Sequence, residues 1–176
     1  MGADRVDRLV ADVTRLQPAI DYESKALGAR LLHLSHLVEQ HYTIVCDQFG
    51  ISLAGHSVLT TLRRHAPREL TPTEINRDAL VTTGGMTFVA GQLLKQGLVA
   101  RRPNPDDHRS ALLRLTPKGR RVADRVIAAV ADADAAIARH MAQHDRRGTE
   151  LVLRILQEGV EEAAGEGGDP PSSKGL

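Results

Sequence analysis

Apolar residues recur along most of the chain at the three- and four-residue spacing of amphipathic helices. One such helix is expected to end before Pro18, a second to run over about residues 22–49, and a shorter one over about residues 52–64. Toward the end of the chain, the same spacing predicts a long Ala-rich helix to about residue 144 and a last helix around residues 151–160. The pattern therefore predicts a mainly α-helical protein.

The segment from residue 98 to residue 119 departs from that pattern. Two short β-prone runs, residues 98–102 and 110–115, flank a turn rich in Pro, Asn and Asp, which predicts a β-hairpin with a long tip. Thr116 can then cap a helix whose first residue is Pro117, where the missing N–H costs nothing. We expect a small β-hairpin followed at once by a long helix.

Two short helices are predicted immediately before the hairpin. The sequence Thr71-Pro72-Thr73-Glu74 is a capping box with proline at the first helical position, so one helix should begin at Pro72 and run to about Leu80. Thr82 or Thr83 can cap the next helix, which should end at Gly97. The apolar face of this second helix is Met86, Val89, Ala90, Leu93 and Leu94. Two short helices followed by a basic hairpin indicate a winged helix-turn-helix.

Small polar residues of the second helix and basic residues of the hairpin are the candidate DNA contacts. A recognition helix reads base edges in the major groove, and a basic arm can lie against phosphates or enter a minor groove. Asp107 is expected to orient Arg109 at the hairpin tip. The candidate DNA-binding residues are Thr71, Thr73, Thr82, Thr83, Gly84, Thr87, Gln92, Arg101, His108 and Arg109, with Arg102 and Arg114 adding to the basic charge of the hairpin.

Charge is distributed unevenly along the chain. The net charge is only +1, yet residues 63–125 contain 13 Lys or Arg against 6 Asp or Glu. Residues 145–176 contain 4 basic and 7 acidic residues. A local basic patch matters more for nucleic-acid binding than the total charge. The low net charge is therefore compatible with DNA binding by the predicted helix-turn-helix.

The stretch from about residue 53 to residue 119 resembles the MarR family of bacterial transcriptional regulators. That family's wing carries Asp-x-Arg, a hydrophobic strand and then Leu-Thr-x-x-Gly, which correspond here to Asp107, Arg109, Leu115, Thr116 and Gly119. The resemblance implies a sequence-specific regulator that binds a pseudo-palindromic operator in double-stranded DNA as a homodimer. It also implies a repressor released by a small-molecule effector.

This assignment divides the chain into four parts. Residues 1–50 supply N-terminal dimerisation helices, residues 51–116 the winged helix-turn-helix domain, and residues 117–164 C-terminal dimerisation helices, while residues 165–176 are expected to be a disordered tail. No stretch approaches membrane-spanning length, so we expect a cytoplasmic protein without a membrane partner. A single cysteine excludes an intramolecular disulfide and fits a reducing compartment.

The added N-terminal helix resembles the urate-responsive branch of the family. That branch uses a Trp, an Asp and an Arg to hold its ligand, and the corresponding positions here are Val13, Ser57 and Val89. Their small or apolar side chains disfavour urate and indicate either a more hydrophobic effector, such as a phenolic molecule, or no effector at all. We expect the effector in a crevice between the dimerisation helices and the DNA-binding lobe.

Redox sensing, zinc sensing and enzymatic activity are alternatives to a regulator that is released by a small molecule. Cys46 could sense peroxide, although a buried, inert thiol fits its surroundings better. The pairs His33/His36 and His140/His144 have helical spacings that could share a zinc ion, but eight histidines produce such spacings by chance. No nucleophile with a base and no phosphate loop is apparent, so a small helical enzyme is disfavoured, and neither a cofactor nor a metal is expected. A purely helical interaction module would leave the basic hairpin unexplained.

Overall fold

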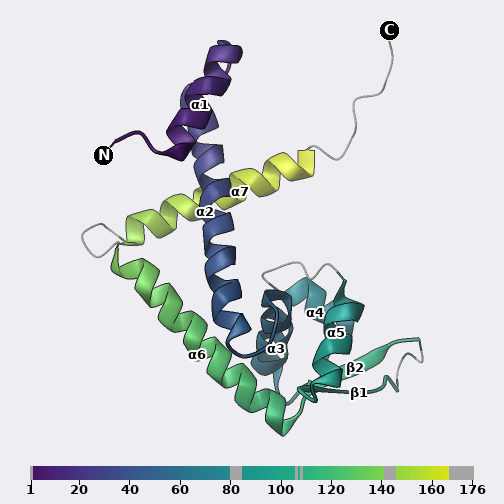
Figure 1. Cartoon of the computed structure of the whole chain (residues 1–176). Helices are drawn as coiled ribbons and strands as arrows, with labels where there is room; N and C mark the ends of the chain where they lie inside the picture. Colours follow the sequence, from purple (N-terminus) through teal and green to yellow (C-terminus); the bar gives the residue numbers. More distant parts are fainter. Residues whose placement is uncertain (1, 80–84, 106, 108, 141–145, 167–176) are drawn as a thin grey trace, which may run out of the picture. The chain divides into compact units, whose positions relative to one another are not determined.

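The computed structural model describes residues 2–79, 85–105, 107, 109–140 and 146–166. Within those ranges the protein has seven α-helices and two β-strands, which confirms the mainly α class with a small hairpin (Figure 1). It divides into two compact units, residues 1–133 and residues 134–176. The elements are α1 (Arg5–Leu16), α2 (Tyr22–Asp47), α3 (Leu53–His65), α4 (Pro72–Asp78), α5 (Met86–Lys95), β1 (Val99–Pro103), β2 (Ala111–Leu115), α6 (Pro117–Arg139) and α7 (Arg146–Glu166).

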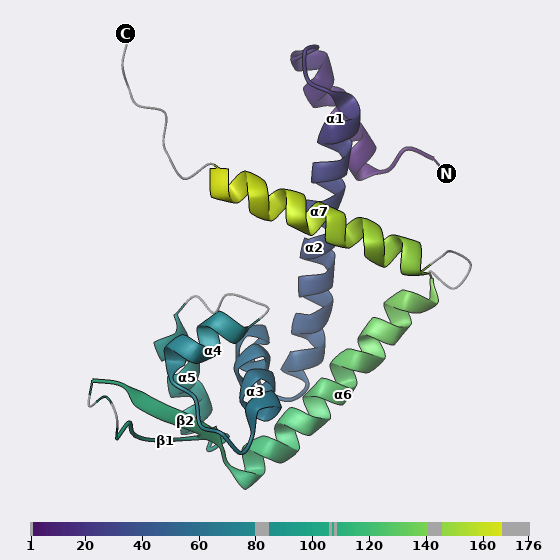
Figure 2. The same cartoon turned by 180° about the vertical axis from the view of Figure 1, so that it is seen from behind.

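Helix α1 packs along the N-terminal part of α2, as Figures 1 and 2 show from opposite sides. It begins with a capping box in which Asp4 and Asp7 bond each other's backbone N–H groups. Arg30 of α2 donates to Asp4 at 2.7 Å and also contacts Asp7. The Arg30 hydrogen bond and the backbone N–H of Asp7 lower the pKa of Asp4 to about 2. Charge pairing and the burial of Val6 and Val10 together fix α1 on α2.

The core of the first unit lies around α3. The C-terminal end of α2 enters this core through Cys46, which is fully buried. Gly50, with φ 67°, ends the α2 segment by allowing the N–H of Ile51 to reach the carbonyl of Cys46 at 3.4 Å. The fully buried side chains of this core include Val58, Leu59, Leu62, Leu70, Ile75, Leu93, Leu113 and Val126.

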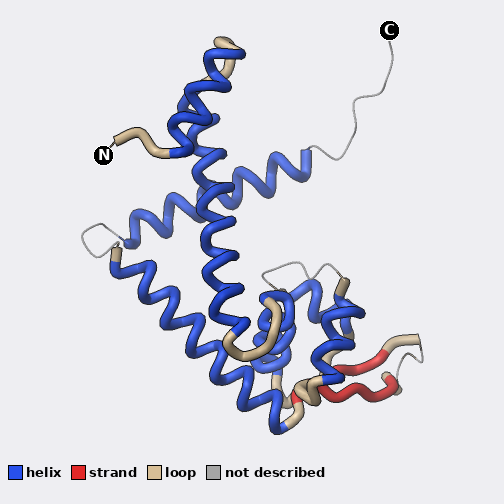
Figure 3. Tube along the Cα trace, in the orientation of Figure 1, coloured by secondary structure: helices blue, strands red, loops and turns tan. Residues whose placement is uncertain are grey.

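Strands β1 and β2 pair antiparallel, with Val99 opposite Leu115 and Arg101 opposite Leu113 (Figure 3, red). The predicted hairpin is confirmed, but the sheet extends further than the sequence pattern indicated. Leu70 exchanges both backbone hydrogen bonds with Leu113, at 3.0 and 2.8 Å, so the residue before α4 acts as a third, one-residue strand. This bridge ties the start of α4 to the wing.

The end of α5, the base of the wing and the start of α6 meet at one junction. Gly97 adopts φ 67° and the N–H of Leu98 reaches the carbonyl of Leu93 at 2.9 Å, as expected for a helix that ends in a left-handed glycine. Thr116 caps α6 by accepting from the N–H of Gly119 at 2.9 Å, and its own N–H donates to the carbonyl of Leu98 at 3.0 Å. A Cβ on Gly119 would lie 1.8 Å from that carbonyl oxygen, so no other residue fits there without backbone movement.

The structure corrects two predicted helix boundaries. The expected cap of α5 by Thr82 or Thr83 is wrong, because α5 begins at Met86 with Gly85, at φ 77°, as its N-cap residue. Helix α6 ends at Arg139, earlier than expected, while α7 is longer than its predicted core and begins at Arg146. No helix in the described part of the chain is both long and apolar enough to cross a membrane. The tail predicted to be disordered lies, apart from residues 165 and 166, outside the described residues.

Candidate nucleic-acid interface

The first group of candidate residues lies at the start of α4. Thr71 caps this helix by accepting from the N–H of Glu74 at 3.2 Å, and the Glu74 carboxylate accepts from the N–H of Thr71 at 2.8 Å. Hydrogen bonds that the carboxylate accepts from the backbone N–H and the hydroxyl of Thr71 lower the pKa of Glu74 below its usual value, so the capping carboxylate stays ionised. Thr73, in the first turn, is exposed. The predicted capping box is confirmed, and it presents two hydroxyl-bearing residues at the N-terminus of α4.

The second group lies on α5, the predicted recognition helix. Its packed face is the predicted one, because Met86, Val89, Ala90 and Leu93 are all buried. Thr87 and Gln92 are exposed on the other side, together with Phe88, Lys95 and the partly exposed Gly91. The candidates Thr82, Thr83 and Gly84 lie outside the described residues.

The third group lies on the wing. The Arg109 side chain is 95% exposed, and its Nε lies 3.5 Å from the Asp107 carboxylate. The same carboxylate accepts from the backbone N–H of Arg109 at 3.0 Å, so Asp107 contacts both the backbone and the side chain of this arginine. Arg101 is exposed on β1. His108 lies outside the described residues.

These three groups border one groove. It has a volume of about 470 Å³ and lies between the start of α4, the side of α5 that carries Thr87, Gly91 and Leu94, and the inner face of the wing. Five of the predicted site residues line it, namely Thr71, Thr73, Thr87, Arg101 and Arg109. Gln92 is on the exposed face of α5 but does not line the groove.

Two of the hairpin's arginines are engaged elsewhere. Arg102 contacts Glu69, and the Nε of Arg114 lies 3.3 Å from the same carboxylate. Both arginines lie on the strand face opposite Arg101, since β1 and β2 residues alternate between faces. The hairpin therefore does not offer five equivalent cations: Glu69 holds two of them, and Arg101 and Arg109 face the groove.

Two residues of this region, Glu69 and Phe88, were not predicted as site residues from the sequence. Glu69 was missed because its partners lie 33 and 45 positions away in the chain and only strand pairing brings them together. Phe88 is 71% exposed on α5 and was not singled out as a candidate contact. Its helical position could have identified it, because it is offset from the apolar stripe of Met86, Val89 and Leu93.

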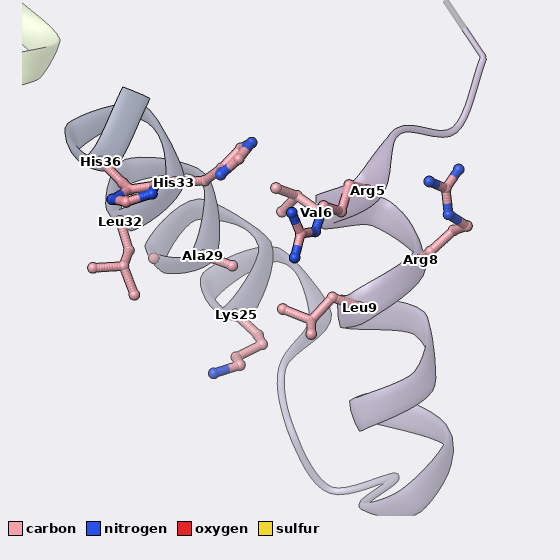
Figure 4. A pocket seen from close by; sticks show the side chains of 10 residues that line it. Arg5, Val6, Arg8, Leu9, Lys25, Ala29, Leu32, His33 and His36 are labelled. Atoms are coloured by element: carbon pink, nitrogen blue, oxygen red, sulfur yellow. The ribbon is translucent and has the colours of Figure 1, made fainter. Parts of the chain in front are cut away.

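A second cavity, of about 670 Å³, lies between α1 and α2 (Figure 4). Apolar side chains including Leu9 and Leu32 line it, and Arg5, Lys25 and His33 add positive or titratable groups. The predicted ligand positions are not brought together here. Val13 is only half-buried on α1 and does not line this cavity, while Ser57 and Val89 are buried in the helix-turn-helix core.

Cys46 and the histidine pairs are the positions of the redox and zinc alternatives. Burial, with a smaller contribution from Asp47, raises the pKa of the Cys46 thiol to about 11, which disfavours the reactive thiolate. Among the described residues, no cluster of three or more His, Cys, Asp or Glu side chains is arranged to hold a metal ion. His33 and His36 line the α1–α2 cavity, and His144 lies outside the described residues.

Residues 49–110, which contain α3, α4, α5 and most of the wing, match the MarR family. The chain is 27% identical over 112 residues to the HTH-type transcriptional regulator PecS of Dickeya dadantii, covering 63% of this chain and 68% of PecS. It is 36% identical over 56 residues to the multiple antibiotic resistance protein MarR of Salmonella typhimurium, covering 32% of this chain and 39% of that protein. The match to the Salmonella protein thus spans well under half of that relative.

The fold is also found among solved structures. The crystal structure of an S. aureus MepR–DNA complex has a TM-score of 0.66 to this chain at 19% identity, covering 77% of this chain and 96% of MepR. At that identity the similarity shows the fold. The winged helix-turn-helix assignment is confirmed by both kinds of comparison.

Cys46 provides a direct test of the redox alternative. Because its pKa is about 11 and not the ordinary 9.0, the thiolate fraction near neutral pH should fall about a hundredfold. Iodoacetamide should therefore label the native protein far more slowly than the urea-unfolded protein, as followed by mass spectrometry. Hydrogen peroxide should leave the DNA affinity of the native protein unchanged. Release of the parent by peroxide, with Cys46→Ser remaining bound, would overturn this prediction.

Proposed function

We propose that this chain is a DNA-binding transcriptional regulator of the MarR family and that it binds an operator through the groove between α4, α5 and the wing. The observation that carries this proposal is the gathering of Thr71, Thr87, Arg101 and Arg109 around one open surface. Hydroxyl groups and arginines are the side chains that bind phosphates and base edges in duplex DNA. The family and the fold are those of a regulator and not of an enzyme.

Each element has a separate role in the proposed complex. Helix α5 enters the major groove with Thr87 and Gln92 toward the bases, as the second helix of a helix-turn-helix does. The exposed start of α4 lies against the phosphate backbone, where the hydroxyl of Thr73 can donate to a phosphate oxygen. Arg109 reaches the adjacent minor groove, and Asp107 orients it. Four positions outside the described residues are proposed as further contacts from their place in the sequence: Thr82, Thr83, Gly84 and His108.

We further propose that the regulator is a repressor that acts as a homodimer on a pseudo-palindromic site. Several long helices carry large apolar side chains that nothing in the described chain covers. In the first unit these include Leu9, Leu16, Leu32, Leu34 and Ile44, and in the second Leu151, Val152, Ile155 and Val160, each more than half exposed. A symmetric partner would bury such stripes and place two recognition helices on successive major grooves.

The dimer is tested by placing a charge in the apolar stripe of α7. Ile155→Glu should shift the protein toward monomer at micromolar concentration, because an unpaired carboxylate would be buried at the interface. Gln157→Glu is the matched control, since it adds the same charge on the same helix beside Glu158. Mass photometry or analytical ultracentrifugation reads the result. A monomeric parent that bound its operator tightly would contradict the proposal.

The wing is tested through the salt dependence of DNA binding. Arg109→Ala should weaken binding to operator and random duplex alike and reduce the slope of log K against log salt by about one per arm, or about two per dimer. Asp107→Ala should have a smaller effect because it removes orientation and no positive charge. Arg15→Ala, which removes an exposed arginine of α1 paired only with Asp12 among described residues, is the control and should leave the slope unchanged. A parental slope for Arg109→Ala would exclude the wing from the interface.

The effector is proposed to be a small hydrophobic or phenolic molecule that binds between α1 and α2. The 670 Å³ cavity there is of ligand size and has an apolar wall. We expect 4-butylphenol to raise the melting temperature and to release DNA, and urate to do neither. Ala29→Phe should abolish the response by filling the cavity, whereas Leu31→Ala, in the smaller neighbouring cavity, should retain it. An unchanged response of Ala29→Phe would locate the ligand elsewhere.

A further inference from the structure

We propose that Phe88 selects thymine in the operator by packing its ring against the C5-methyl group in the major groove. This inference rests on the proposed DNA-binding function, which places α5 in that groove. It adds a specificity-determining residue that carries no hydrogen-bonding group and was not among the predicted contacts.

The exposure of Phe88 stands out on its own helix. Phe88 is 71% exposed. The packed apolar residues of α5 are between 2% and 8% exposed, namely Met86, Val89, Ala90 and Leu93. The chain has only one other phenylalanine, Phe49, which packs against the core and holds the Arg125 guanidinium 5.4 Å from its ring centroid. A single exposed apolar side chain is ordinary on a protein surface, so the position of Phe88 carries the argument.

Phe88 lies in the first turn of α5, next to the groove that holds the candidate DNA contacts. Its N–H donates to the carbonyl of Gly85 at 2.8 Å, which fixes its place in that turn. The preceding residue, Thr87, lines the groove with Arg101 and Arg109, and Gln92 follows one turn later on the same side. In helix-turn-helix proteins the N-terminal residues of the recognition helix are the ones that contact base edges.

Within the described part of the chain, the surface of α5 beside the ring is open at Gly91. Gly91 lies three residues after Phe88, and a Cβ added there would meet no atom within 4 Å. A base pair can therefore approach this side of α5 without meeting another side chain at position 91. Phe88 is flanked by a hydroxyl, a glycine and an amide, and only the ring offers apolar area on this face.

The chemistry of the ring selects one base. Phenylalanine neither donates nor accepts hydrogen bonds, so it cannot distinguish the donor and acceptor patterns of the base edges. Thymine alone among the four bases carries a methyl group in the major groove, and apolar contact with that methyl is an established mode of readout. Gln92 can bond adenine through its N6 and N7. The face of α5 is thus suited to a half-site that contains A·T pairs.

The test removes only the methyl group. Operators are first selected from a random duplex library by the full-length parent protein, and each thymine of a half-site is then replaced by deoxyuridine. The parent should bind about fourfold more weakly when the thymine that Phe88 contacts is replaced. The operator then lacks one methyl group whose burial against the ring contributes to affinity. Phe88→Ala should bind the thymine and uracil operators equally, and Phe88→Leu should retain part of the difference. Library selection with Phe88→Ala should lose the preference for thymine at that position.

Gln92→Ala is the matched control, because it alters the same face of α5. It should weaken operator binding and keep the uracil penalty. All variants should melt like the parent, since neither side chain is buried. The proposal is overturned if uracil has no effect at any position, or if the penalty persists in Phe88→Ala. It is also overturned if Phe88→Ala changes the mass of the assembly, which would make Phe88 a protein contact. Failure of the parent to select any site would instead overturn the proposed function itself.

Discussion

The close approach of Gly119 to the carbonyl of Leu98 is the contact on which the DNA-binding lobe depends. It lets α6 begin directly against the chain segment that leaves α5, and Thr116 bonds both Gly119 and Leu98 at the same point. Lys118 adds a bond to the carbonyl of Gln96 at 2.8 Å, which satisfies a free carbonyl at the end of α5. The recognition helix, the base of the wing and the long helix that leaves the lobe are therefore fixed relative to one another by hydrogen bonds to backbone groups. An interface that must match the spacing of a DNA groove requires such rigidity.

Acidic side chains of this lobe form ion pairs with arginines. This pairing explains how a chain of net charge +1 can present a basic surface. Glu69 contacts Arg102 and Arg114 on one face of the hairpin, so these arginines neutralise a carboxylate that would otherwise repel phosphate. Glu74 is held in the α4 cap and contacts Arg68. Among the described residues, Glu69 and Glu74 are thus occupied internally, and Asp107 of the wing tip contacts Arg109. Exposed pairs of this kind add little to stability, so their main effect here is on the electrostatic surface.

Local rules predicted the parts of this structure that local interactions determine. The capping box at Thr71, the glycine that ends α5 at Gly97 and the Thr116 cap of α6 were all readable because each depends on residues within a few positions. The bridge between Leu70 and Leu113 was not readable, since a single residue pair gives no strand pattern. The start of α5 was misplaced because threonine is a good cap by propensity, whereas the structure uses Gly85 in a left-handed conformation. The ligand positions transferred by resemblance do not line the cavity between α1 and α2, and they stay a prediction. Ser57 and Val89 lie within the core, where packing and not recognition determines the residue.

Helix α2 is the element through which a ligand between α1 and α2 could alter DNA binding. Its N-terminal part lines the 670 Å³ cavity, and its C-terminal part enters the core of the DNA-binding lobe through Tyr42, Val45 and Cys46. A continuous helix of 26 residues transmits a displacement along its length far better than a loop would. Filling the cavity changes DNA affinity only if the ligand binds more tightly to one of two arrangements of α2 against the lobe, and DNA must then change the ligand's affinity by the same factor. Reciprocal coupling of that kind distinguishes an effector from a molecule that merely stabilises α1 on α2, because the latter would raise the melting temperature and leave DNA binding unchanged.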